Sequence, residues 1–350
     1  MKLPFAPACL PLLLGDLPHR SAAQALELSR RYAGEIVSWP QLPQRSFREQ
    51  GFVQSAIGFP GLEVDAAHSR VYVDRARAEL ALDRLGLAYL EDRSAYAALA
   101  ADDAAGFDEL FRQADSVRGA PALKGQLMGP ISLAAQLTDE RDRPLIYDEM
   151  LFDALTQHLG LRAEWLETRL RGLGSPTLIC FEEPFLESVG LPFLPLDWDR
   201  AREQIDLALL GVRGCRAIFA GGSVIWSEVL QTSVDMIIAD VYEHGHALAA
   251  AASALGPFIE RGGVVGFGLV PNDEEALAQA SADGLIDRIL ALAGAIEAGG
   301  VGAQQLMRQA VVSTAGSLGR LPLHAAERAM QIVAEVSKLL RQQYDLGGTP

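Results

Sequence analysis

The sequence predicts an α/β fold, the (β/α)8 TIM barrel, and three observations lead to this fold class. Eight short apolar runs alternate with helical patterns along most of the 350-residue chain. The runs are continuously hydrophobic, which is typical of parallel strands covered on the outside by helices. The rival fold, a doubly wound open sheet, is disfavoured because no Gly-x-Gly-x-x-Gly turn follows the first run.

The strands and helices of this barrel follow one another in chain order. We expect strands at residues 9–14, 35–39, 122–127, 177–181, 216–219, 236–239, 264–268 and 310–313. Helical periodicity predicts the main helices at residues 21–32, 147–173, 199–210, 247–259, 274–297 and 325–341. The helix from residue 274 has a clear start, because acidic residues after Pro271 favour a first helical turn.

One long insertion separates the second and third strands. We expect a single barrel domain over residues 1–350, with an inserted hairpin and helical segment at about 46–115. The stretch "LEVDAAHSRVYVD" within it reads as two strands around a polar turn. Long insertions belong over the C-terminal face of a barrel, where they can form a lid.

Composition limits the class of protein and its partners. The formal net charge is −15, and such an acidic surface repels phosphate backbones and anionic lipids, so we expect no nucleic-acid or membrane partner. Three scattered cysteines, Cys9, Cys180 and Cys215, fit buried thiols in a reducing compartment. Prolines break the apolar N-terminal run, which we interpret as a strand instead of a signal peptide. We therefore expect a cytoplasmic protein.

Candidate site residues stand where the expected strands end, because barrel enzymes carry their chemistry there. The candidates are Asp16, His19, Gln41, Arg45, Lys124, Gln126, Glu182, Glu183, Asp240, Tyr242, His244 and His246. Simpler roles stay open for several of them. The two glutamates could cap a helix, Lys124 could pair with an acid, and Tyr242 could serve packing. The two histidines could be solvated surface, or bind a metal with Asp240.

In order along the chain, "GDLPH", "WPQLPQRSFRE", "KGQLMGPIS", "CFEEP", "DMIIADVY", "GVVGFGLVPND" and "VVSTAGSLG" carry a family resemblance. They resemble the barrel domain of cobalamin-independent methionine synthase and, more closely, its short single-barrel relatives. That superfamily also includes uroporphyrinogen decarboxylase and corrinoid-linked methyltransferases. The resemblance covers nearly the whole chain and implies the same barrel fold.

The family's zinc ligands do not carry over to this chain. The resemblance places Phe219 and Gly221 at the family's His-x-Cys ligands and Gly316 at its late cysteine, and only the acidic ligand is kept, as Asp240. Zinc needs three or four N, S or O donors, so we expect no zinc and no protein-held cofactor. The chain therefore departs from an ordinary methionine synthase.

Three functions remain open. The first is zinc-independent methyl transfer from methylcobalamin or methyl-folate, with a corrinoid protein as a potential partner. In it Glu182, Asp240 and His19 would be catalytic, and the substrate would meet Asp16, Gln41, Arg45, Gln126, Glu183, Phe219, Gly221, Tyr242 and Gly316. The second is a lyase like uroporphyrinogen decarboxylase, which is disfavoured because the entrance motifs supply mainly Arg45 and Arg48 as cations. The third is a non-catalytic barrel that binds a small molecule or a partner.

Overall fold

A computed structural model describes residues 5–347 and shows the expected barrel. Eight parallel strands form one sheet in the order β1-β11-β10-β9-β8-β7-β5-β2. The strands are β1 (Leu10–Pro11), β2 (Ile36–Ser38), β5 (Ala122–Met128), β7 (Thr177–Glu182), β8 (Cys215–Ala220), β9 (Met236–Asp240), β10 (Val264–Val270) and β11 (Ala310–Thr314). All eight predicted strands are confirmed.

The barrel closes weakly where β1 meets β2. Only an isolated parallel bridge between Asp16 and Gln41 joins the two chain segments, beyond the ends of both strands. Side chains supply further bonds across this seam: the Ser38 hydroxyl donates to the Leu13 carbonyl at 2.9 Å. The Lys124 ammonium donates to the Leu14 carbonyl at 2.5 Å. In place of a regular ladder, the seam therefore combines the backbone hydrogen bonds of this bridge, from the Gln41 N–H to the Gly15 carbonyl and from the Leu17 N–H to the Gln41 carbonyl, with side-chain donors.

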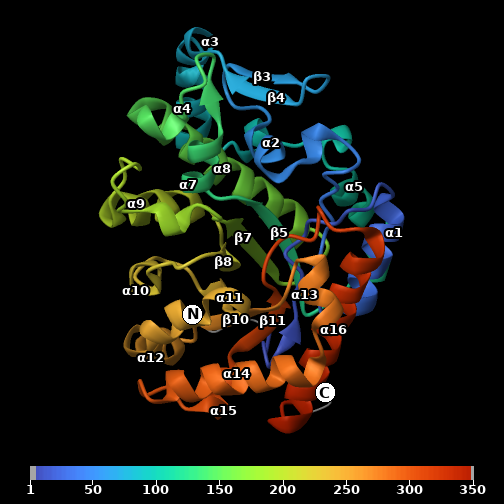
Figure 1. Cartoon of the computed structure of the whole chain (residues 1–350). Coiled ribbons are helices and arrows are strands. Elements are labelled where there is room, and N and C mark those ends of the chain that lie inside the picture. Colours follow the sequence, from blue (N-terminus) through green and yellow to red (C-terminus); the bar gives the residue numbers. More distant parts are fainter. Residues whose placement is uncertain (1–4, 348–350) are drawn as a thin grey trace.

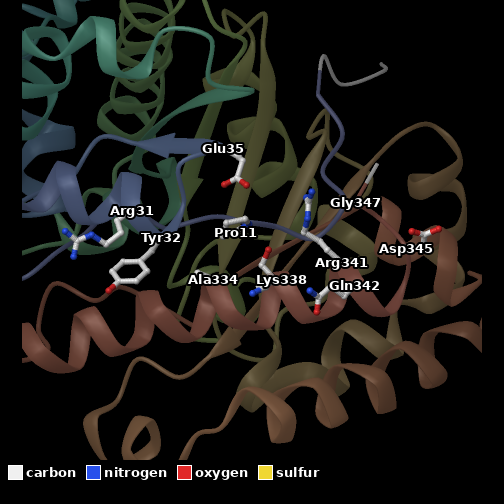
Figure 2. Close-up of a pocket in the computed structure, with 11 residues that line it drawn as sticks. Pro11, Arg31, Tyr32, Glu35, Ala334, Lys338, Arg341, Gln342, Asp345 and Gly347 are labelled. Carbon is white, nitrogen blue, oxygen red and sulfur yellow. The ribbon is translucent and has the colours of Figure 1, made fainter. Parts of the chain in front are cut away.

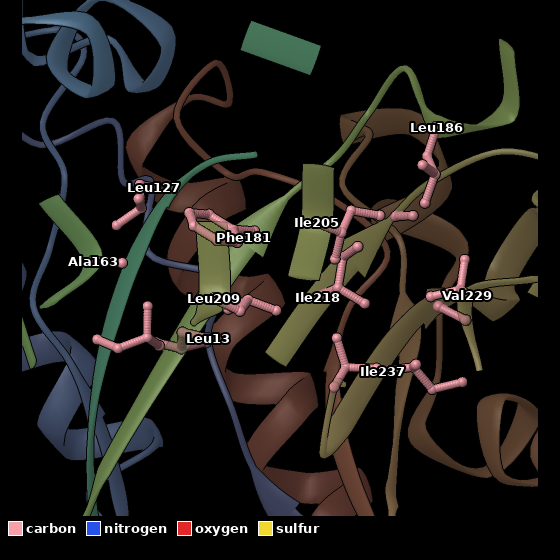
Figure 3. Close-up of a cluster of buried hydrophobic side chains, with 14 of the residues drawn as sticks. Leu13, Leu127, Ala163, Phe181, Leu186, Ile205, Leu209, Ile218, Val229 and Ile237 are labelled. Carbon is pink, nitrogen blue, oxygen red and sulfur yellow. The ribbon is translucent and has the colours of Figure 1, made fainter. Parts of the chain in front are cut away.

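Two apolar clusters divide the strands into an inner and an outer face. Alternate residues such as Leu178, Cys180 and Ala217 fill the barrel interior. The residues between them, such as Phe181 and Ile218, pack outward against the helices (Figure 3). This alternation follows from the two-residue period of a strand. It decides which polar residues at the strand ends face the interior.

Helices surround the sheet, and most lie where periodicity predicts them. They are α1 (Ala22–Tyr32), α2 (Gly51–Ala56), α3 (Arg75–Glu79), α4 (Leu82–Leu90), α5 (Ala105–Arg112), α6 (Ala114–Val117), α7 (Pro130–Gln136), α8 (Glu149–Arg171), α9 (Trp198–Leu209), α10 (Trp226–Val229), α11 (Val241–Ala250), α12 (Ala252–Glu260), α13 (Glu274–Gln279), α14 (Ala282–Glu297), α15 (Ala303–Arg308) and α16 (Leu323–Gln343). Short 3-10 turns supplement them at η1 (Phe47–Glu49), η2 (Ser94–Ala97), η3 (Ala101–Asp103), η4 (Leu145–Tyr147) and η5 (Leu186–Ser188).

Two predicted helices are each divided in the structure. The helix expected at 247–259 is α11 and α12, which meet at Ala251. The helix expected at 274–297 is α13 and α14. The second division has a local cause, because the Ser281 hydroxyl accepts a hydrogen bond from the Gly284 N–H and caps a new helix start. Among the described residues no helix combines the length and apolar character needed to cross a membrane.

The insertion after β2 contains the predicted hairpin, β3 (Leu62–Asp65) and β4 (Arg70–Val73), and a short strand β6 (Thr138–Asp139) adds to it. The hairpin and helices α2 to α4 gather at one end of the molecule (top of Figure 1), whereas α5 lies beside α1. Buried Arg162 of α8 contacts the insertion through hydrogen bonds that it donates to the carbonyls of Gln54, Ile57 and Ala97. This buried guanidinium is one of several contacts that hold the insertion to the barrel, together with the hydrogen bond from the Met128 N–H to the Ser55 hydroxyl at 2.9 Å.

A groove of about 610 Å³ opens beside the seam, between α1 and α16 (Figure 2). On the side of the strands the groove is lined by Pro11 of β1 and by Glu35, just before β2. On the side of the helices it is lined by Arg31, Lys338 and Arg341. Glu35 precedes β2, so it lies at the N-terminal end of that strand, whereas Asp16 and Gln41 follow the C-terminal ends of β1 and β2. The groove is therefore at the opposite end of the barrel from the predicted site residues.

Candidate functional site

The inward-facing positions near the C-terminal ends of the strands are polar, in contrast to the apolar layers below them. Strand alternation places Lys124, Gln126, Glu182, Asp240 and Ser313 on the same face as the interior cluster. Asp16 follows the same alternation beyond β1. The sequence thus brings several of the predicted residues to one end of the barrel interior.

Lys124 is the buried cation of this layer. It is fully buried, although it is one of only three lysines in the chain. Its ammonium donates to the Leu14 carbonyl at 2.5 Å and to Gln126 Oε1 at 3.3 Å. Burial lowers its pKa, and the nearby charges of Glu182 and Asp16 act against that shift. Lys124 therefore places a positive charge near two acids and joins β5 to the segment that follows β1.

Asp16 and Glu182 are the acids beside Lys124. Burial raises the pKa of Asp16, although a 2.9 Å hydrogen bond from the Ser317 hydroxyl opposes the shift. Burial also raises the pKa of Glu182 to about 8, and the charge of Asp16 adds to that effect. A carboxyl group with such a pKa holds a proton at neutral pH and can release it. Glu182 is therefore suited to acid–base chemistry.

Three buried oxygens of this layer have no protein partner among the described residues. They are Asp16 Oδ1, Glu182 Oε1 and Ser313 Oγ. Buried polar atoms are almost always hydrogen-bonded, so such a group of exceptions marks a place where a ligand or water can bind. The three atoms come from β7, from β11 and from the loop after β1. They outline the polar end of the barrel interior.

Glu183 has a different environment from its neighbour Glu182. Alternation turns it to the outer face, where it is fully buried. Its oxygens accept hydrogen bonds from the backbone N–H groups of Ile131 at 3.0 Å and Ser132 at 2.7 Å. Burial raises its pKa to about 7, and these hydrogen bonds oppose the shift. Glu183 thus caps the start of α7, and a Cβ at Gly129 would overlap its carboxylate.

The amides expected to contact substrate also have protein partners. Gln126 donates to the Trp39 carbonyl at 2.8 Å, and Gln41 donates to Gln54 of the insertion at 2.8 Å. Both are about 1% exposed. These bonds connect β5 and the seam with the insertion. A substrate contact would require them to exchange partners.

The two arginines at the barrel entrance are paired with acids. Arg45 donates to Glu49 and to the Asp102 carbonyl, the latter at 3.3 Å. Arg48 donates to Asp103 at 2.5 Å. Both pairs lie within the insertion and its base. Their charges are consequently neutralised locally.

His19 and Tyr242 lie to the side of the polar layer. Burial lowers the pKa of His19, and the nearest opposing influence is Glu327 of α16. No hydrogen bond or ion pair within residues 5–347 joins it to Glu182. The Tyr242 ring packs against Arg288 of α14, whose guanidinium carbon lies 4.3 Å from the ring centroid. The catalytic role of His19 stays a prediction.

The positions that correspond to the family's zinc ligands lack donor atoms. Phe219 faces the interior, and a Cβ built on Gly221 would meet nothing within 4 Å. At Gly316 a side chain would overlap Asn272. Within the described residues, no three His, Cys, Asp or Glu side chains are placed to hold one metal ion. This donor set does not fit zinc.

The loop after β8 brings Ser223, which was not among the predicted site residues, to the predicted residues His244 and His246. The Ser223 hydroxyl lies 3.4 Å from His244 Nδ1 and 3.4 Å from His246 Nε2. On a regular helix these two histidine side chains would point in different directions, but α11 has a non-helical backbone conformation at His244. The available signal was the pair Gly221-Gly222 before Ser223, since paired glycines after a strand mark close backbone approach.

The comparison with solved structures supports the fold, whereas the sequence comparisons found no match. No family model matches the sequence, and no curated protein is significantly similar to it. A methyltransferase from Methanosarcina mazei is similar in structure, with a TM-score of 0.53 and 14% identity over 95% of this chain and 94% of that one. A protein assigned as a vitamin-B12-independent methionine synthase from Listeria monocytogenes gives 0.47 and 11% over 69% and 70%. At these identities the first likeness shows the barrel fold alone.

Proposed function

We propose that this barrel transfers a methyl group to a small molecule without zinc, and that its reacting groups meet at the polar end of the barrel interior. One observation carries the proposal. Glu182 faces the interior with an unpartnered buried oxygen and a pKa raised to about 8, beside Lys124 and Asp16. The motif resemblance supports methyl transfer as the reaction class.

Glu182 would act on the leaving group of the methyl donor. In a displacement, the methyl group forms a bond to the acceptor while its bond to the donor breaks. The donor keeps the electron pair of the broken bond. A folate-type amine leaves more easily when protonated, and protonated Glu182 can supply that proton. Lys124 then stabilises the carboxylate that remains. The acceptor's own proton restores Glu182, so the cycle is balanced.

Zinc-independence follows from the donor set described above. A thiol acceptor is only a few per cent ionised at neutral pH and would need activation that Phe219, Gly221 and Gly316 cannot provide. An acceptor whose nitrogen is largely unprotonated at neutral pH, such as an aromatic amine, needs no such activation. We therefore propose a nitrogen nucleophile as the acceptor. The donor would be a methyl-folate, or methylcobalamin presented by a corrinoid protein.

The test is a methyl-transfer assay on protein treated with a chelator. Methyl-folate and methylcobalamin are offered with separate panels of amine and thiol acceptors. We expect transfer to an amine, lowered at least about 100-fold by Glu182→Gln. Glu260→Gln, at an exposed position on α12, is the matched control and should keep the wild-type rate. Stoichiometric zinc in the purified protein, or activity confined to thiols after zinc is added, would contradict the proposal.

The same experiment also tests the two other functions, a lyase and a non-catalytic binding protein. A lyase acting on a polycarboxylate would need free cations at the entrance, whereas Arg45 and Arg48 are already paired with Glu49 and Asp103. A binding module would show ligand-dependent thermal stabilisation without turnover of either donor. Either result would replace methyl transfer as the function.

A further inference from the structure

Ser223 lies at the C-terminal end of β8, in a loop that holds it in one position. Gly222 has a φ of +80°, a conformation that favours glycine, and a Cβ there would overlap the carboxylate of Glu187. That carboxylate accepts a hydrogen bond from the Ser223 N–H at 3.1 Å. The backbone before and at Ser223 is thus fixed. Its side chain is exposed and free to react.

Two imidazoles converge on the Ser223 hydroxyl. His244 Nδ1 and His246 Nε2 each lie 3.4 Å from Oγ, and the ring centroids are 6.1 Å apart. These distances are at the long end of hydrogen bonding, as is common before substrate binds. The irregular backbone of α11 at His244 is what allows two histidines in a His-x-His spacing to approach one hydroxyl.

Asp240 completes the cluster from the end of β9. Its Oδ2 lies 3.9 Å from His244 Nε2, the ring nitrogen that faces away from Ser223. Its Oδ1 accepts a hydrogen bond from the Glu243 N–H at 3.1 Å, which fixes the carboxylate at the start of α11. A hydroxyl, an imidazole and a carboxylate therefore follow one another in order. This is the order of groups in nucleophilic acyl transfer.

Donors for a developing oxyanion lie next to the hydroxyl. In the part of the chain that the structure describes, the N–H groups of Val224 and Ile225 donate to no protein acceptor. Acyl-transfer enzymes of other folds use the N–H that follows the nucleophile for this purpose. The Ile225 side chain is 51% exposed and offers an apolar contact to a small acyl group.

We propose that Ser223 is a nucleophile with His244 as its base and Asp240 as the residue that orients the base, and that the cluster hydrolyses esters of small acyl groups. Oγ bonds to the acyl carbon as its proton passes to His244. The bond to the leaving alcohol breaks, and the alcohol takes that proton. Water then releases the acid by the same route and restores Ser223. This activity goes beyond methyl transfer and does not depend on Glu182.

The test combines hydrolysis of p-nitrophenyl acetate with labelling by a fluorophosphonate probe, both in the presence of a chelator. We expect the probe on the peptide that contains Ser223. Ser223→Ala and His244→Gln should each lower kcat/KM at least about 100-fold. Ser227→Ala, four residues away on α10, is the matched control and should hydrolyse the ester at the wild-type rate.

Three results would overturn this assignment. Ser223→Ala could keep the wild-type rate, the probe could label another residue, or the untreated protein could lose its hydrolysis when the chelator is added. The last result would show that a metal bound by the imidazoles supplies the nucleophile. Circular dichroism of each variant shows that a lost rate does not reflect unfolding. Failure of methyl transfer would leave this result unaffected, because the two assays use different donors and residues.

Discussion

The ends of β1, β5 and β7 and the ends of β8 and β9 belong to one barrel but hold their polar side chains differently. Around β5, Lys124 is fully buried and bonded to the Leu14 carbonyl, between two acids. Around β8, Ser223 is exposed and lies 3.4 Å from its two histidines. Lys124 and its neighbours cannot change hydrogen-bond partners without disturbing the seam. Ser223 and its histidines can change partners without that cost. Polar residues at a barrel mouth thus divide between holding the fold and remaining reactive.

Removing the buried cation tests the first group most severely. Lys124→Met should lower the free energy of unfolding by about 3–5 kcal/mol, because the Leu14 carbonyl and Gln126 lose a buried charged donor and two nearby buried acids lose a positive charge. Urea unfolding at neutral pH measures the loss. Lys338→Met, at an exposed position on α16, should change it by less than about 0.5 kcal/mol. Equal stability of the two variants would show that Lys124 has no structural role.

The neighbouring acid Glu183 belongs to the same structural group. Glu183→Ala should cost about 1–3 kcal/mol of unfolding free energy, because the N–H groups of Ile131 and Ser132 lose a buried acceptor. Glu183→Gln should cost less, since its amide oxygen can still accept one hydrogen bond. Urea unfolding compares them. A Gln variant as unstable as the Ala variant would exclude helix capping as the cause.

The two glycines before Ser223 offer a matched pair for the second group. Gly222→Ala should destabilise the protein by about 1–2 kcal/mol and displace Ser223, because φ is positive there and Glu187 occupies the space. Gly221→Ala should be nearly neutral, since its added Cβ meets open space. Thermal unfolding and ester hydrolysis measure both effects. Equal effects would mean that the loop does not hold Ser223.

The smallest expected effect is a change in how stability depends on pH. The pKa of Glu182 is about 8 in the folded state against an ordinary value of 4.5, so the folded protein binds more protons between these values. Its contribution to stability is present below 4.5 and is lost as pH rises through 8. Glu182→Gln removes this loss. Between about pH 5 and pH 8.5, the free energy of unfolding of Glu182→Gln should rise relative to that of the wild type by at least about 1 kcal/mol.

Urea unfolding of both proteins across that range measures this difference. The exposed Glu260→Gln variant should follow the wild-type curve throughout. A constant difference between wild type and Glu182→Gln would mean that Glu182 titrates normally. It would also remove the main support for its acid–base role.

The strands were predictable because their hydrophobicity is continuous and their spacing regular. Alternation within a strand separates Glu182 from Glu183, so their opposite directions also followed from the sequence once the end of β7 was placed. That Glu183 caps α7 was harder to predict from the sequence, because its hydrogen-bond partners on α7 lie about 50 residues earlier in the chain. Which elements a side chain contacts across that distance depends on packing.

The meeting of Ser223 with two histidines could not be predicted from spacing. His244 and His246 diverge on a regular helix, and only the irregular turn at His244 brings them together. The seam is a similar case. Beside the backbone bridge of Asp16 and Gln41, its bonds come from the Ser38 and Lys124 side chains. The sequence pattern of a strand does not indicate that two neighbouring strands will lack a ladder. The catalytic and substrate-contact roles stay predictions.

The sparse seam has a consequence for the order in which the chain folds during synthesis. The ladder partner of β1 is β11, with Leu10 opposite Val311, whereas among the described residues the only backbone pairing between the β1 and β2 segments is the Asp16–Gln41 bridge. A ribosome makes β1 first and β11 about 300 residues later, so β1 must wait for most of the chain before its backbone can pair. During that interval the strands from β2 to β10 can assemble, and chaperones would find β1 as the exposed apolar segment.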